Sequence, residues 1–187
     1  LGGSMSCQDD AEAPWLAPTR QLISRTVRAG TPFLGICLGH QLATVALGGQ
    51  VCTSDHFCLG AAEMHLTPEG KKDPLLSVYD GHRGIHFNND VAVVLPEDAV
   101  LLARDPTGQI EAVRFAERAW GVQFHPECTP EIFDAWTIGH GEKEWQQRLP
   151  WSEAVTVAET VRRDIDTVNA EEAFAARFQE LIDPEKR

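Results

Sequence analysis

The sequence predicts an α/β domain built on an open sheet, and three observations support that fold class. An apolar segment at residues 33–36 runs through the motif G-x-C-x-G into a helix-like segment at 38–47, an order typical of a strand, a sharp turn and a helix. Extended segments separated by turn signals fill the middle of the chain. A length of 187 residues suits one domain with a sizeable core.

The remaining elements are predicted from local signals along the chain. Residues 1–6 have the pattern of a strand end entering a glycine-rich loop. Thr19 can cap a helix that runs to about Ala29, where Gly30 ends it. A short helix begins at Pro130, because proline suits the first helical position. Further strands are expected at residues 60–66, 84–87, 100–104, 110–115 and 119–124.

We expect three regions in the chain. Residues 1–138 form the α/β domain, and residues 139–150, with glycine, proline and charged side chains, form a linker. Residues 151–187 form a C-terminal helical appendage with one buried face, because apolar residues recur there near helical spacing. These apolar positions are Val155, Ala158, Val161, Ile165, Val168, Phe174, Phe178, Leu181 and Ile182.

Composition excludes several classes of partner. The formal net charge is -12 and no basic patch is present, so we expect no nucleic-acid partner. No apolar run approaches the roughly 20 residues of a membrane span, and no secretory signal is visible. The five cysteines are odd in number and irregularly spaced, which indicates a reducing compartment and favours the cytoplasm.

A metal site can be imagined from Cys52, His56, Cys58 and His65. Their spacing matches no zinc pattern, and ordinary packed or exposed side chains explain them better. We therefore predict neither a metal nor a cofactor.

The G-x-C-x-G motif points to Cys37 as a nucleophile. Gly35 and Gly39 leave room for a sharp turn that lifts the sulfur out of the backbone. At that position the sulfur faces the positive end of the following helix, which favours thiolate over thiol. A raised thiolate is suited to attack on an acyl group.

A partner for this cysteine is predicted at His125. In extended backbone, His125 and Glu127 point to the same side, and Pro126 limits how the histidine can turn. Glu127 can then bind one imidazole nitrogen while the other faces Cys37, so that the imidazole can accept and return a proton. The oxyanion formed on attack needs N–H donors, for which Leu38 and the Gly2-Gly3 loop are candidates.

Taken together, GICLGHQ at residues 35–41 and GVQFHPE at 121–127 resemble the class I (triad) glutamine amidotransferases. The opening LGGSMS and the APWL at residues 13–16 are similar, in their spacing, to a stand-alone branch often called GMP synthase-like. The resemblance covers roughly residues 1–136. It implies a flavodoxin-like, mostly parallel sheet, and glutamine or another γ-glutamyl compound as substrate, cleaved through a thioester. The implied roles are nucleophile for Cys37, acid and base for His125, orienting group for Glu127, oxyanion donors for Gly3 and Leu38, and substrate contact for Gln41.

Some positions depart from the family's pattern. Ser4 stands where the family's loop usually has proline. Asn88 and Asn89 precede Asp90 where many members have His-x-Asp, and because that segment commonly borders the substrate they are candidate binding residues. The family fold also begins with a strand and a helix ahead of the glycine loop, about 40–50 residues that we expect in a preceding segment.

Several functions remain open at this point. The chain could supply ammonia to a separate synthetase subunit, or cleave γ-glutamyl compounds by itself as a catabolic hydrolase. No P-loop pattern or spare length for a fused synthetase is visible. A catalytically silent regulatory or binding module is the alternative from another class, and a chaperone or redox enzyme with the same elbow is disfavoured by His125 and Glu127. A homodimer is also left open.

Overall fold

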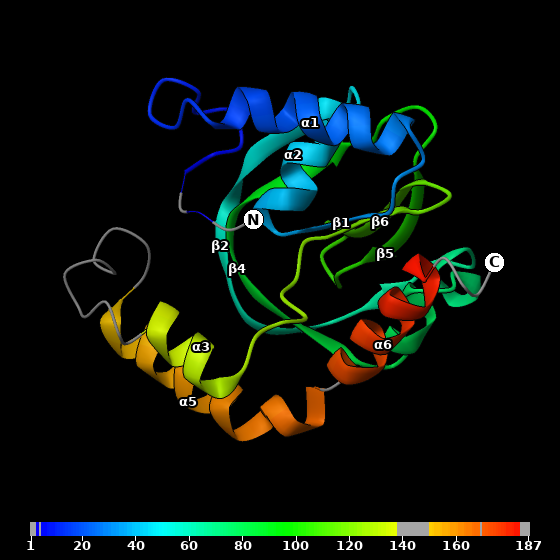
Figure 1. Cartoon of the computed structure of the whole chain (residues 1–187). Coiled ribbons are helices and arrows are strands. Elements are labelled where there is room, and N and C mark those ends of the chain that lie inside the picture. The colour runs from blue at the N-terminus through cyan, green and yellow to red at the C-terminus, as the bar shows by residue number, and fades with distance from the viewer. Residues whose placement is uncertain (1–2, 4, 138–149, 169, 184–187) are drawn as a thin grey trace.

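The computed structural model describes residue 3 and residues 5–137, 150–168 and 170–183, with the backbone alone at 164–168. These residues form a five-stranded sheet in the order β1-β7-β6-β5-β3 and a two-stranded sheet of β2 and β4 (Figure 1). The strands are β1 (Phe33–Ile36), β2 (Gln50–Glu63), β3 (His65–Leu66), β4 (Arg83–Val94), β5 (Val100–Arg104), β6 (Ile110–Ala116) and β7 (Ala119–Val122). The helices are α1 (Leu16–Arg28), α2 (Leu38–Ala46), α3 (Pro130–Trp136), α5 (Trp151–Val168) and α6 (Glu171–Ile182), with short 3-10 turns η1 (Gly70–Lys72) and η2 (Leu76–Tyr79).

Strands β1 and β7 form a parallel pair in the five-stranded sheet, with Phe33 opposite Ala119 and Ile36 opposite Val122. The other pairings in this sheet are antiparallel. Connections as short as residues 105–109 and 117–118 can only form hairpins, because a parallel return needs a crossover of a dozen or more residues. The α/β class is confirmed, while the described strands contain fewer parallel pairs than we expected.

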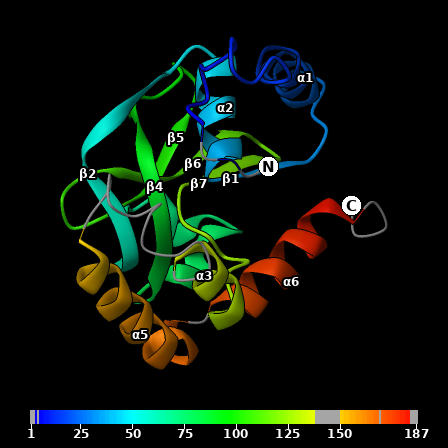
Figure 2. The same ribbon diagram turned by 90° about the vertical axis from the view of Figure 1, so that its left-hand side faces the viewer.

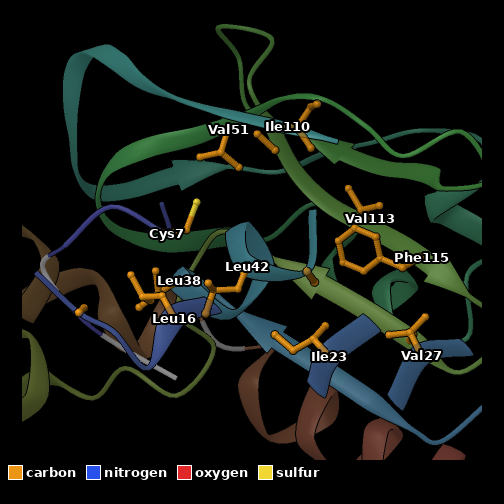
Figure 3. Close-up of a cluster of buried hydrophobic side chains, with 14 residues drawn as sticks. Cys7, Leu16, Ile23, Val27, Leu38, Leu42, Val51, Ile110, Val113 and Phe115 are labelled. Atoms are coloured by element: carbon orange, nitrogen blue, oxygen red, sulfur yellow. The ribbon is translucent and has the colours of Figure 1, made fainter. Parts of the chain in front are cut away.

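Two layers of helix cover the five-stranded sheet. Helices α1 and α2 lie on one side, where Val113 and Phe115 of β6 join their core (Figures 1 and 3). Helix α6 and the 3-10 turns lie on the other side, where Ala112 of the same strand contributes to a second core. Alternate residues of a strand point to opposite faces, so a single strand serves both layers.

A buried carboxylate ties the 3-10 turns to the sheet. Asp73 Oδ1 accepts hydrogen bonds from the backbone N–H of Leu75 at 2.9 Å and from the indole of Trp120 at 3.2 Å. Its second oxygen lies 3.1 Å from Nε of Arg114, and the Asp73 side chain is fully buried. One charged group therefore links the start of η2 to strands β6 and β7.

Helix boundaries agree with the predictions at two places and differ at a third. Helix α2 follows Cys37 directly, and Thr129 accepts a hydrogen bond from the N–H of Ile132 as the cap of α3. Helix α1, however, begins at Leu16, so the prediction that Thr19 caps it is wrong. The Thr19 hydroxyl lies inside the first turn and donates to the carbonyl of Trp15 at 2.7 Å.

The two-stranded sheet is longer than the predicted extended segments. Strand β2 starts at Gln50 and pairs with β4 along its length, with an irregularity between Thr53 and Cys58. The polar run at residues 53–56 lacks the alternation of apolar and polar residues that marks a half-buried strand. The local pattern therefore did not reveal this part of β2.

The C-terminal helices pack on the rest of the chain. Figures 1 and 2 show α3 and α5 side by side, and Ala158 and Val161 of α5 share a core with Phe133 of α3. In α6, Phe174 packs edge-to-face on Tyr79, with ring centroids 5.6 Å apart. Residues 139–149 of the predicted linker at 139–150, and the side chains of Ile165 and Val168, lie outside the described residues. Among the helices that the structure describes, none combines the length and apolar character needed to cross a membrane.

Candidate active site

Cys37 occupies the turn between β1 and α2 in a strained backbone conformation. Its φ is 49° and its ψ is -109°, the single positive φ of a non-glycine residue in the described chain. A Cβ placed on Gly35 would lie 2.6 Å from the carbonyl of Gly39, so only glycine permits this turn. The N–H of Cys37 donates to the carbonyl of Val122 at 2.8 Å, which holds the turn against the end of β7. The predicted elbow is therefore present.

His125 and Glu127 follow the end of β7 and reach the same site. Nδ1 of His125 lies 2.8 Å from Oε1 of Glu127, and because a carboxylate only accepts, Nδ1 carries the proton. The side chain of Cys37 also interacts with this imidazole and helps to raise its pKa. On its flank the ring contacts Trp136, with ring centroids 4.5 Å apart. The structure thus brings the three predicted residues together in the predicted order.

The charges of this group favour an imidazolium. Burial by itself would lower the pKa of His125, but the hydrogen bonds to Cys37 and Glu127 raise it to about 9. Burial opposes ionisation of Glu127, yet its hydrogen bond from His125 holds the pKa of this carboxyl below its ordinary value. At neutral pH the imidazole is therefore protonated and faces the sulfur.

A pocket of about 220 Å³ opens beside the sulfur. Gly3 and Leu38, the predicted oxyanion donors, both line it, and a Cβ on Gly3 would lie 3.2 Å from Cδ2 of Leu38. Leu38 is the first residue of α2, where backbone N–H groups have no partner within the helix. Gly2 and Ser4 lie outside the described residues. The full lining is Gly3, Met5, Ser6, Cys37, Leu38, Gln41, Thr53, Phe57, Phe87, Asn88, Asn89 and Asp90.

The predicted substrate-binding residues differ in how their side chains are used. Nε2 of Gln41 donates to the carbonyl of Asp90 at 2.8 Å and to Oε1 of Gln123 at 3.2 Å. Nδ2 of Asn88 donates to the same carbonyl at 3.2 Å, and Asn88 is buried. Asn89 is exposed at the pocket. Contact of these residues with a substrate stays a prediction.

Sequence reasoning missed Gln123. Its side chain is fully buried, and its Nε2 donates to Sγ of Cys37 at 3.6 Å. The signal was available, because Gln123 precedes His125 by two positions and a period of two places both on one side of extended backbone. Trp136 was also missed, and nothing in its local sequence marks it as a neighbour of the histidine.

His40 lies within the first motif but outside the group of polar contacts. Its ring is fully buried against Phe115, with centroids 5.9 Å apart, and a Cβ on Gly121 would meet it. Neither ring nitrogen has a hydrogen-bond partner among the described residues. Burial lowers the pKa of His40 to about 4, so at neutral pH this ring is uncharged and contributes to packing.

Metal-ligating side chains are not gathered in the part of the chain that the structure describes. No group of three or more His, Cys, Asp or Glu residues there could hold an ion. Cys52 and Cys58 both lie on β2, and all five cysteines are free thiols.

The fold and the site together define a class of α/β protein in which an elbow cysteine at a strand end faces a histidine–glutamate pair. A family model described as "Glutamine amidotransferase class-I" matches residues 8–139. The chain belongs to the class I glutamine amidotransferase family.

Individual relatives agree with this assignment. The chain is 37% identical over 115 residues to a glutamine-hydrolyzing GMP synthase of Marinobacter nauticus, covering 54% of this chain and 20% of that protein. It is 34% identical over 101 residues to one subunit of the glutamine-hydrolyzing GMP synthase of Methanothermobacter thermautotrophicus, covering 51% of each. The chain therefore spans about half or less of the length of these two relatives.

A solved structure supports the fold. A glutamine amidotransferase from Thermotoga maritima superposes with a TM-score of 0.79 at 21% identity, covering 98% of this chain and 76% of that one. The flavodoxin-like fold class predicted from the sequence is confirmed.

Proposed function

We propose that this chain hydrolyses a γ-glutamyl amide, of which glutamine is the simplest, through a thioester on Cys37. The observation that carries the proposal is the position of His125, which is hydrogen-bonded to Glu127 on one side and interacts with Cys37 on the other. Such an arrangement activates a thiol and delivers a proton to a leaving amine. Membership of the class I family supports glutamine as a substrate.

The first half-reaction forms the thioester. The sulfur of Cys37 attacks the γ-carbonyl carbon, and the C=O electron pair moves onto oxygen. The N–H of Leu38, assisted by the backbone of Gly3, would stabilise this oxyanion; each such donor is typically worth about 3 kcal/mol of the barrier. The C–N bond then breaks as the imidazolium of His125 gives its proton to the leaving nitrogen, which departs as ammonia or an amine.

The second half-reaction releases glutamate. Neutral His125 takes a proton from water, and the resulting hydroxide attacks the thioester carbon. Collapse of the second oxyanion breaks the C–S bond, so that the sulfur leaves as thiolate beside the restored imidazolium. Glu127 keeps the ring in one tautomer through both steps, because it accepts from Nδ1 throughout.

The test is release of ammonia or amine from glutamine and a panel of γ-glutamyl amides. Replacing the nucleophile, Cys37→Ala, is expected to lower turnover by several orders of magnitude. Cys58→Ala is the matched control, since this thiol does not line the pocket and its removal should leave turnover intact. Wild-type turnover in Cys37→Ala would overturn the proposal.

We also propose that the ammonia passes to a separate synthetase subunit. The relative from Methanothermobacter is named as one subunit of a GMP synthase, which supports a partner of this kind. Stimulation of glutamine hydrolysis by an added synthetase subunit would favour this version. Faster cleavage of larger γ-glutamyl amides by the isolated chain would favour a self-standing hydrolase.

Five free thiols support a cytoplasmic location for either kind of enzyme.

A further inference from the structure

A relay of side-chain amides ends at the catalytic sulfur. Nε2 of Gln123 donates to Sγ of Cys37 at 3.6 Å, while its Oε1 accepts from Nε2 of Gln41 at 3.2 Å. Nε2 of Gln41 also donates to the backbone carbonyl of Asp90 at 2.8 Å. The backbone of Gln123 is fixed as well, because its N–H donates to the carbonyl of Glu111 at 2.8 Å. The side-chain amide of Gln123 thus contacts Cys37 and Gln41 directly, while Asp90 fixes Gln41.

The relay determines which end of the Gln123 amide faces Cys37. The carbonyl of Asp90 can only accept, so Gln41 must present its NH₂ group to it. That NH₂ group then requires the oxygen of Gln123 as its second acceptor. If the Gln123 amide were flipped, two NH₂ groups would face each other in a buried site, which is unfavourable. The sulfur is therefore always met by an N–H donor.

We propose that Gln123 is a positioning residue for Cys37, whose fixed N–H holds the sulfur towards the pocket and favours its thiolate form. The physical reason is that a hydrogen bond donated to the charged form of a group stabilises that form. Gln41 and the carbonyl of Asp90 act through Gln123 by fixing the direction of its amide. The inference rests on the proposed role of Cys37 as nucleophile.

A second glutamine–cysteine pair in the same chain has the opposite polarity. Sγ of Cys58 donates to Oε1 of Gln109 at 3.6 Å, and Nε2 of Gln109 points away to the hydroxyl of Ser54 at 3.4 Å. Burial is the main reason that the pKa of Cys58 is raised to about 11. Both contacts join a glutamine to a cysteine at 3.6 Å, but Gln109 presents its oxygen to Cys58, whereas Gln123 presents its N–H to Cys37.

Titratable groups around Cys37 must stay unchanged for a test of Gln123 to be clear. His125 faces the sulfur, with Glu127 behind it, and Asp90 lines the same pocket as the sulfur. Replacing Gln123 removes none of these charges. A change in the ionisation of the sulfur would then report the lost amide.

The experiment measures the rate of alkylation of Cys37 by iodoacetamide as a function of pH, with the modified peptide identified by mass spectrometry. In Gln123→Leu the midpoint of the profile should move up by about 1 pH unit, because one donor to the thiolate is lost. In the nearly isosteric Gln123→Glu it should move further, because an acceptor with negative charge replaces the donor. Glutamine hydrolysis should lose about tenfold in kcat with little change in KM.

The matched control is Gln109→Leu, which removes the other amide–sulfur contact and should leave the Cys37 profile unchanged. An unchanged profile in folded Gln123→Leu and Gln123→Glu would overturn the inference. If these variants do not fold, Gln41→Met decides, since it keeps Gln123 but frees its amide and should still move the midpoint upward. Alkylation needs no substrate, so a failed hydrolysis assay would count against the proposed function and leave this result standing.

Discussion

Nδ1 of His125 donates to Glu127 at 2.8 Å, and this contact leaves the opposite edge of the ring for Cys37. The two residues are separated by one proline, so the contact is local. It explains why a buried imidazole keeps a pKa of about 9, since the carboxylate and the sulfur outweigh the effect of burial.

Glu127→Gln should weaken the enzyme and shift its pH profile. Without the carboxylate, the pKa of His125 falls from about 9 towards its ordinary value of 6.5. As the pH rises, the imidazolium that protonates the leaving amine then loses its proton earlier than in the wild type. The alkaline limb of kcat therefore moves to lower pH. We expect kcat at neutral pH to fall about 10²-fold, the contribution typical of a positioned acid.

The control for this change is Glu131→Gln, an exposed carboxylate in the first turn of α3. Its pH–rate profile should match that of the wild type. An alkaline limb that stays in place in Glu127→Gln would show that the carboxylate does not set the charge of His125.

Gly35→Ala should destabilise the fold through the elbow. The new methyl group would lie 2.6 Å from the backbone of Gly39, which has no freedom to move inside α2. Overpacking of this kind costs about 1–3 kcal/mol, measurable as a lower urea midpoint. Gly30→Ala provides the comparison, because its φ of 69° is strained for alanine but nothing lies within 4 Å. A smaller loss in Gly35→Ala than in Gly30→Ala would contradict the packing argument.

His40 should make the fold sensitive to acid. Its pKa is about 4 in the folded chain and 6.5 in the unfolded one, so the unfolded state binds the proton first as pH falls. The contribution of His40 to the free energy of unfolding is therefore fully present above pH 6.5 and is lost as the pH falls towards 4. At 1.4 kcal/mol per pH unit the total is about 3 kcal/mol.

The measurement is the free energy of unfolding from pH 7 to pH 4.5 in wild type and His40→Leu. The variant should lose less stability over that range than the wild type. His65→Gln, at an exposed position, should follow the wild-type curve. Parallel curves for wild type and His40→Leu would disprove the assignment.

Asp73→Ala should be strongly destabilising, although the residue lies away from the pocket. The change leaves the indole of Trp120 and two backbone N–H groups without their shared acceptor, and it leaves the guanidinium of Arg114 without its counter-ion. The Arg114 side chain is 34% exposed and can be solvated, but each buried donor left without an acceptor costs about 1–3 kcal/mol, which chemical denaturation would reveal. Asp10→Ala removes a half-exposed ion pair with Arg20 and should destabilise the fold far less, because solvent screens this pair. Equal losses in the two variants would refute the prediction.

The sequence by itself determined the local parts of the site. The elbow followed from the glycines around Cys37, and at Gly35 a Cβ would lie 2.6 Å from the backbone of Gly39. The contact between His125 and Glu127 followed from extended backbone and one intervening proline. Strand and helix types were predicted from periodicity, whereas the start of α1 and the length of β2 were not. Helix α1 begins after Trp15, which forms no side-chain cap, and the length of β2 is set by its pairing with the distant strand β4.

Only the tertiary structure decided how these parts meet. Cys37 and His125 come together because β1 and β7 are parallel neighbours, so that both strands end at the same edge of the sheet. The direction of the Gln123 amide depends on Gln41, which lies 82 positions before Gln123, and on the carbonyl of Asp90, which lies 49 positions after Gln41. An amide has no preferred direction of its own, so its donor end is set by the groups that the fold places around it.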